Sequence, residues 1–147
     1  MPDGNFLTGK IETITDKSQE VIPNADWVFL CLPAFKVEKT IISIKPFLNS
    51  DTIVGSVVGN TGFFIYSHEH LSLNSKLFSF QRVPYISRII EYGKKANLLG
   101  YRDPLILAVE NVDEKEEFRQ QVQELFGEST VLADSFYEVT LSNSNPI

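Results

Sequence analysis

The sequence contains little cysteine, no long apolar run and no cluster of basic residues. One cysteine in 147 residues excludes an internal disulfide and favours a reducing, cytoplasmic location. No apolar run approaches the ~20 residues that a membrane span requires, so no membrane partner is expected. The net charge is −6, and Lys and Arg are never more than two in a row. A nucleic-acid partner is therefore not expected either, because phosphate binding needs a basic face.

Several common site motifs are also missing. The sequence has no Gly-x-Gly-x-x-Gly, no Gly-x-x-x-x-Gly-Lys-Ser/Thr and no Cys/His spacing typical of a metal site. The remaining composition, 43% hydrophobic and 12% aromatic, is that of an ordinary globular protein. We expect a single domain over residues 1–147, large enough to bury about two thirds of its unfolded surface.

A continuous apolar stretch, residues 27–32, organises the chain. It lacks polar alternation, which is typical of a strand buried on both faces of a parallel sheet, and it includes Cys31. Pro33 ends the strand because proline cannot donate to a ladder. A helical pattern follows, and then a second strand at 52–58. In such a βαβ unit, ligands lie beyond the carboxyl ends of the strands, which here means residues 32–35.

The rest of the chain predicts alternating elements. Asp113 and Glu116 suggest a capping box, and Gly127 a helix end. The expected elements are a short strand at 10–15, a short helix at 16–24, a turn at 59–62, an aromatic segment at 63–71, a strand at 76–81, a hairpin of 86–91 and 95–99 with Gly93 at a positive-φ turn position, a strand at 105–110, a helix with Phe118, Val122, Leu125 and Phe126 buried, a strand at 130–133 and a helix at 135–141.

Two groups of reactive side chains have ordinary explanations. His68, Glu69 and His70 place two imidazoles two residues apart, which on a strand would share a face and on a helix would diverge. Without a third ligand in the sequence pattern, we interpret them as a solvated surface turn. Cys31, as a thiol in an apolar strand, is expected to stay protonated and not to act as a nucleophile.

Two stretches resemble the octopine/opine dehydrogenase family. The first is Ala25-Asp26-x-Val28-x-Leu30-x-x-Pro33-Ala34-Phe35, similar to the family's fourth-strand motif. The second and more specific is Ser79-Phe80-x-x-Val83-Pro84-Tyr85-x-x-Arg88-Ile89-x-Glu91-Tyr92-Gly93-Lys94-Lys95-x-x-x-Leu99-Gly100. With Ile53-Val54-Gly55 and Thr61-Gly62-Phe63 between them, the resemblance covers residues 24–102.

The resemblance implies an α/β fold, a three-layer Rossmann-like sheet, and a reaction. Family members join a 2-oxo acid and an amino acid and reduce the resulting imine with NADH or NADPH. Carried over by position, Leu32, Pro33, Ala34 and Phe35 would line the nicotinamide and ribose side of the cofactor. Asn60 and Arg82 would face the 2-oxo acid carboxylate, which Arg82 can bind with two parallel hydrogen bonds. For each of these two residues a structural role, as turn residue or ion-pair partner, remains the alternative.

The resemblance also implies that the sheet is partial. The family's first strands and Gly-rich loop would precede Lys10, and its helical domain would follow Ile147. We therefore expect a fragment that does not turn over substrate alone. The open edge beside the Trp27 strand would be covered by residues 10–15 or by a second copy in a homodimer. Two alternatives stay open: a non-catalytic binding or interaction domain on the same scaffold, and a relative of the ketopantoate or hydroxyacid reductases.

Overall fold

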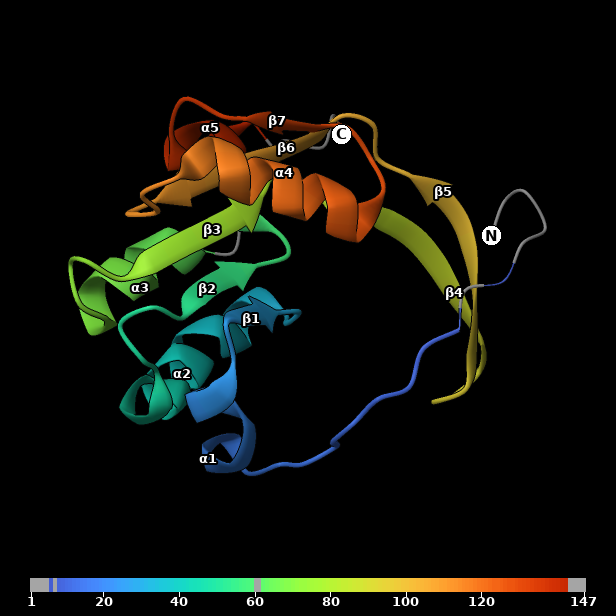
Figure 1. The fold of residues 1–147 in the computed structure, drawn as a ribbon, viewed down its shortest axis with the longest axis horizontal. Helices are drawn as coiled ribbons and strands as arrows, with labels where there is room; N and C mark the ends of the chain where they lie inside the picture. The colour runs from blue at the N-terminus through green and yellow to red at the C-terminus, as the bar shows by residue number, and fades with distance from the viewer. Residues whose placement is uncertain (1–5, 7, 60–61, 143–147) are drawn as a thin grey trace.

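The computed structural model describes residues 6, 8–59 and 62–142. Its centre is a five-stranded sheet in the order β1-β2-β3-β6-β7 (Figure 1). The strands are β1 (Trp27–Leu30), β2 (Ile53–Ser56), β3 (Lys76–Phe80), β6 (Leu105–Glu110) and β7 (Thr130–Leu132). The first three strands are parallel, β6 runs antiparallel to β3, and β7 is parallel to β6.

Helices cover both faces of this sheet and make three layers. One face packs against α2 (Ala34–Ile44), α3 (Phe63–His70) and α5 (Phe136–Leu141), whose buried side chains share one apolar cluster with β1, β2 and β3. The other face packs against α4 (Lys115–Phe126) through a second cluster centred on Phe78, Phe80 and Phe118. The three-layer Rossmann-like class predicted from the sequence is therefore confirmed.

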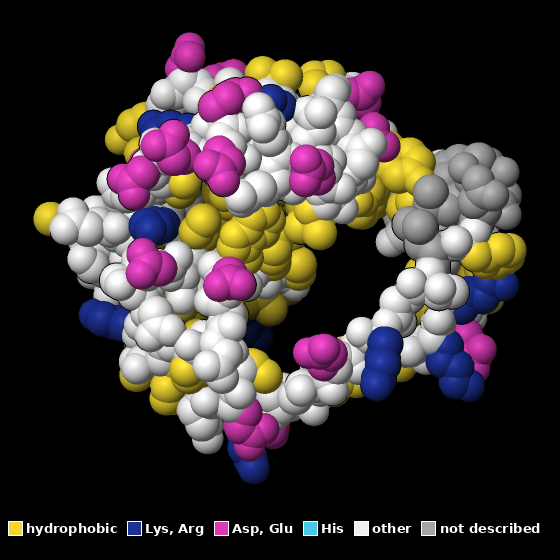
Figure 2. Space-filling view, in the orientation of Figure 1, with side chains coloured by type: hydrophobic (Ala, Val, Ile, Leu, Met, Phe, Trp, Pro, Cys, Tyr) yellow, Lys and Arg dark blue, Asp and Glu magenta, His cyan; other side chains and the backbone are white. Residues whose placement is uncertain are grey.

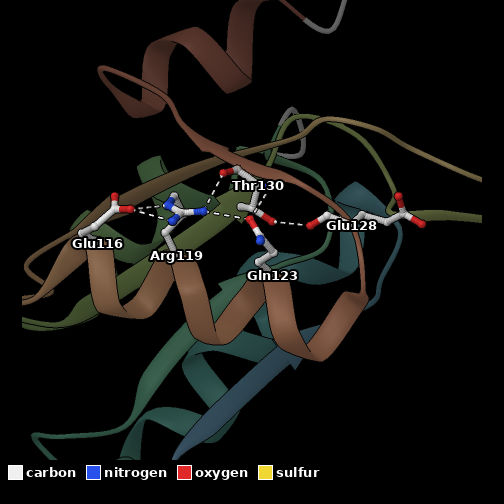
Figure 3. A network of polar contacts seen from close by, with 5 residues as sticks. All are labelled: Glu116, Arg119, Gln123, Glu128 and Thr130. Carbon is white, nitrogen blue, oxygen red and sulfur yellow. Dashed lines mark hydrogen bonds and ion pairs between the residues drawn. The ribbon is translucent and has the colours of Figure 1, made fainter.

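Polar contacts join α4 to β7 beside this second cluster (Figure 3). Arg119 donates to the Glu116 carboxylate at 2.7 Å, to Gln123 Oε1 at 2.9 Å and to the Thr130 carbonyl at 3.1 Å. Gln123 Oε1 also accepts from the Thr130 backbone N–H at 3.2 Å, and Thr130 Oγ1 donates to the Glu128 carbonyl. These contacts hold α4 against β7. Gly127, with φ of 72°, ends α4 as predicted.

The β1 strand is shorter and less buried than its sequence predicts. It ends at Leu30, so Cys31 and Leu32 lie outside it and are exposed, and the expectation of a buried Cys31 was wrong. Val28 and Leu30 are buried, but Trp27 and Phe29 on the α4 side are half-buried. The reason is position: β1 is an edge strand of the described sheet, so it has a neighbouring strand, β2, on one side only.

The segment expected to cover that edge lies elsewhere. Residues 10–15 form no strand and are mostly exposed, so the strand prediction was wrong. This segment runs from α1 (Ser18–Val21) and the 3-10 turn η1 (Ile22–Asn24) toward a projecting hairpin (Figure 1). Phe6 lies there, with Lys95 Nζ 5.5 Å from its ring centroid. The alternation of residues 10–15 was too short a signal to specify a partner strand.

The projecting hairpin pairs β4 (Tyr85–Glu91) with β5 (Lys95–Tyr101), as predicted, and Gly93 has φ of 72°.

Three smaller predictions need correction. The residue before α4 is Glu114 and no side chain caps the helix, so Asp113 and Glu116 form no capping box. Leu125 is 57% exposed. His68 and His70 are in the last turn of α3, not in a surface turn. A second 3-10 turn, η2 (Lys45–Phe47), follows α2.

None of the helices in the described residues is long and apolar enough to cross a membrane.

Candidate functional site

A pocket lies where β1 and β2 end and α2 begins. Its volume is about 440 Å³. The lining residues are Leu30, Cys31, Leu32, Pro33, Ala34, Val57, Val58 and Val83. Parallel strands place their carboxyl ends on the same edge of the sheet, and the connections that follow them meet there. The pocket is therefore where the order of the elements predicts a ligand.

The wall formed by residues 30–34 combines apolar side chains with free backbone donors. Pro33 precedes α2 with φ −60° and ψ 147°, its carbonyl accepts from the Lys36 N–H at 2.9 Å, and no side chain caps the helix. The first N–H groups of a helix have no intrahelical acceptor, and they carry partial positive charge. This wall can therefore hold a planar apolar group next to an anionic one.

The opposite wall comes from the chain after β2 and after β3. The Val57 N–H donates to the Leu30 carbonyl at 3.1 Å, which fixes the loop after β2 against the end of β1. Val83 supplies the third side, directly after Arg82, which is half-buried. Sequence reasoning missed these three valines. It placed Val57 and Val58 inside the strand predicted at 52–58, but β2 ends at Ser56. Val83 follows the strand predicted at 76–81, and that position was an available signal.

The structure brings together three of the four residues predicted to bind the cofactor. Leu32, Pro33 and Ala34 line the pocket, whereas Phe35 is not among the lining residues and is 78% exposed. Of the two residues predicted to bind substrate, Arg82 adjoins the pocket-lining Val83, and Asn60 lies outside the described residues. The roles of all six remain predictions.

Cys31 is at the exposed rim of this pocket. Partial burial of its thiol raises its pKa, so the protonated form dominates at neutral pH. This direction agrees with the expectation that Cys31 is not an activated nucleophile, although its location differs from the predicted one.

The helix α5 contacts the loops that follow β2 and β3. Thr140 Oγ1 donates to the Gly59 carbonyl at 3.3 Å, and Gln81 Nε2 donates to Ser142 Oγ at 2.6 Å. A Cβ at Gly59 would lie 3.0 Å from Val139 Cγ2, so the loop passes close to the helix. These contacts fix the backbone on either side of the pocket.

The fold and the pocket define the class: a Rossmann-like α/β domain with a site at the carboxyl edge of its parallel strands. No family model matches this chain. It is 25% identical over 145 residues to the opine dehydrogenase of Haliotis discus hannai, covering 94% of this chain and 36% of that protein. It is 26% identical over 136 residues to the octopine dehydrogenase of Mizuhopecten yessoensis, covering 88% of this chain and 34% of that protein.

The structural comparison agrees. A structure of octopine dehydrogenase with NADH and L-arginine superimposes with a TM-score of 0.81 and 24% identity, over 91% of this chain and 35% of that one. The resemblance to the octopine/opine dehydrogenases inferred from the sequence motifs is thus confirmed. The chain spans about a third of the length of the relatives it matches.

Proposed function

We propose that this chain supplies the nicotinamide side of an NAD(P)H site in an opine-type dehydrogenase. The observation that carries the proposal is the pocket formed by residues 30–34 with Val57, Val58 and Val83. Its support comes from the similarity to opine and octopine dehydrogenases, and from the matched octopine dehydrogenase structure, which is a complex with NADH. The substrates would be a 2-oxo acid and an amino acid.

Each wall of the pocket has a separate role in this proposal. Leu32, Pro33 and Ala34 exclude water from one side of the nicotinamide and ribose, and the N-terminal N–H groups of α2 bind an anionic group of the cofactor. The cofactor supplies the hydride that reduces an imine carbon. Arg82 and Asn60 would orient the substrate carboxylate, Arg82 through its planar pair of donors.

The test is binding of NADH and of NADPH to this chain, observed by changes in amide NMR signals. We expect the signal changes to be confined to residues 30–36 and to Val57 and Val58. We also expect these changes to saturate as the nucleotide concentration rises. Ala34→Asp, which adds a negative charge at the start of α2, should weaken binding by about tenfold or more, since tenfold corresponds to only about 1.4 kcal/mol. Ser43→Asp adds the same charge at the other end of this helix and is the matched control.

Either of two outcomes would contradict the proposal. One is the absence of any signal change with both nucleotides; the other is equal weakening by Ala34→Asp and Ser43→Asp. We also propose that the chain alone does not turn over substrate. Loss of reduced nicotinamide in the presence of this chain, a 2-oxo acid and an amino acid would overturn that part separately.

The open edge of β1 supports a second component of the proposal, a homodimer. The Asp26 and Leu30 carbonyls accept from Ile53 and Val57 on the β2 side, so by alternation the backbone groups of Trp27 and Phe29 point to the open edge. Hydrophobic side chains are exposed on the side of the sheet that faces the opening toward the hairpin (Figure 2). The same edge suits the alternative of a non-catalytic interaction domain.

Sedimentation tests the proposed homodimer. A homodimer through β1 predicts a concentration-dependent doubling of mass, together with a blue shift of the Trp27 fluorescence as its ring loses contact with water. A chain that remains monomeric at every concentration, with unchanged Trp27 emission, would count against the dimer.

A further inference from the structure

A group of three ligand-type side chains joins α2 to α3. Glu38 comes from α2, and Glu69 and His70 from the last turn of α3. One ligand atom from each of these residues lies within 4.8 Å of the other two. The sequence pattern gave His68 and His70 no third ligand, and they were interpreted as a solvated surface turn. In the fold, His70 pairs with Glu38, which is 32 residues away in the sequence.

The distances fit a metal ion with little rearrangement. His70 Nε2 and Glu38 Oε1 are 3.1 Å apart. A tetrahedral zinc ion with bonds of about 2.0–2.1 Å holds neighbouring ligand atoms about 3.3 Å apart. The third ligand, Glu69, is an exposed side chain, so rotation about its own bonds can bring its carboxylate closer without moving the backbone.

Charge and accessibility favour a cation at this point. Two carboxylates together balance the charge of a divalent ion, and a metal-bound neutral imidazole adds no charge. Glu69 and His70 lie at the C-terminal end of α3, where the helix dipole attracts positive charge. The His70 side chain is 22% exposed and that of Glu38 is 47% exposed, so one side of the group is open to water.

We propose that Glu38, Glu69 and His70 bind a divalent transition metal, with Zn²⁺ as the best match. One imidazole nitrogen and two carboxylate oxygens are donors that zinc accepts, and calcium and magnesium prefer oxygen donors alone. A water molecule completes the fourth position. The site links α2 to α3, and it does not depend on the function proposed above.

His68 offers a matched control on the same helix. Its Nε2 lies 2.6 Å from Glu110 Oε2, so it too is paired with a carboxylate. Among the described residues, no third ligand-type side chain joins His68 and Glu110 in a group like the one around Glu38. His68 and His70 therefore differ in the feature on which the proposal depends, the presence of a second carboxylate.

The test is a calorimetric titration of the untagged chain with ZnCl₂, repeated with His70→Ala, Glu69→Gln and His68→Ala. We expect one zinc per chain in the wild type. His70→Ala and Glu69→Gln should each weaken binding by about tenfold or more, and His68→Ala by less than about twofold. Glu69→Gln alters only an exposed side chain, so it remains interpretable if His70→Ala perturbs the packing of α2 on α3, which far-UV circular dichroism would detect.

A second measurement identifies the ligands. Co²⁺ bound by these residues should produce the visible absorption of a four-coordinate site, which His70→Ala removes and His68→Ala leaves unchanged. The proposal is overturned if the wild type takes up no zinc at a defined stoichiometry. It is also overturned if His68→Ala reduces the affinity as much as His70→Ala does, because the ion would then bind to surface histidines in general.

Discussion

β3 and β4 follow one another in the chain and both are rich in apolar residues, yet they have opposite environments. In β3, Leu77, Phe78 and Phe80 are at most 1% exposed. In β4, Ile86, Ile89 and Ile90 are 52–68% exposed. The difference is one of position: β3 is the middle strand of five with helices on both faces, and β4 has only β5 as a neighbour. Apolar composition therefore does not by itself specify burial.

The hairpin depends on its base for stability. An isolated two-stranded hairpin is marginally stable in water. At the base, Tyr85 Oη donates to the Phe126 carbonyl at 2.9 Å, and its ring contacts those of Tyr101 and Phe126. Burial there raises the pKa of Tyr85, so the phenol stays protonated as a donor well into the alkaline range. The exposed isoleucines farther out contribute little to the stability of the fold.

The largest expected difference in stability between the two regions comes from truncating one buried and one exposed side chain. Phe78 has no exposure and its ring contacts those of Trp27, Phe29, Phe80 and Phe118. Phe78→Ala should lower the free energy of unfolding by about 3–5 kcal/mol. Ile89→Ala on the hairpin should change it by less than about 0.5 kcal/mol. Urea denaturation measures both, and similar losses would contradict the contrast.

Glycine substitutions should give a smaller difference in stability between the sheet and the hairpin. A Cβ at Gly55 in β2 would lie 2.2 Å from the Phe78 ring, whereas a Cβ at Gly100 in β5 would meet nothing within 4 Å. Gly55→Ala should therefore destabilise by about 1–3 kcal/mol through overpacking. Gly100→Ala should be neutral or slightly stabilising, because alanine loses less backbone entropy on folding. Thermal unfolding of the pair tests this, and a greater loss at Gly100 would refute it.

The smallest expected effect is electrostatic and lies between β2 and β3. Asp51 accepts from Lys76 Nζ at 2.9 Å, and this hydrogen bond lowers the pKa of the Asp51 carboxyl. Because the folded-state pKa is lowered, the pair stabilises the fold above the ordinary carboxyl pKa, and this contribution is lost as the pH falls through the folded value. Lys76→Met should raise the Asp51 pKa toward its ordinary value in an NMR titration. Lys94→Met on the hairpin is the control, and an equal shift in both would disprove the assignment.

Local patterns were sufficient where a residue's neighbours in sequence decide its structure. The continuous apolar run and Pro33 placed β1 and the start of α2, and Gly93 and Gly127 marked a hairpin turn and a helix end that both require positive φ. The residues predicted to line the cofactor, Leu32, Pro33 and Ala34, lie at the pocket because a strand followed by a helix has few ways to connect.

The predictions that failed concerned distant partners. Residues 10–15 alternate like a strand, but a strand needs an edge to pair with, and the segment runs to the hairpin instead. Cys31 was assigned to a buried strand because its apolar neighbours could not show that β1 lies at the edge of the described sheet. Val57, Val58 and Val83 lie at the pocket because β2 pairs with β1 and β3 pairs with β2, which the local pattern does not specify.

The sequence by itself determined the class of fold, most of the elements and the position of the pocket along the chain. These depend on periodicity, on proline and on glycine, whose effects extend over a few residues. Only the tertiary structure decided which apolar strands are buried, and which carboxylate lies beside which histidine. Glu38 pairs with His70 and Glu110 with His68 across gaps of 32 and 42 residues. Such contacts arise from the packing of α2, α3 and β6, which no local pattern specifies.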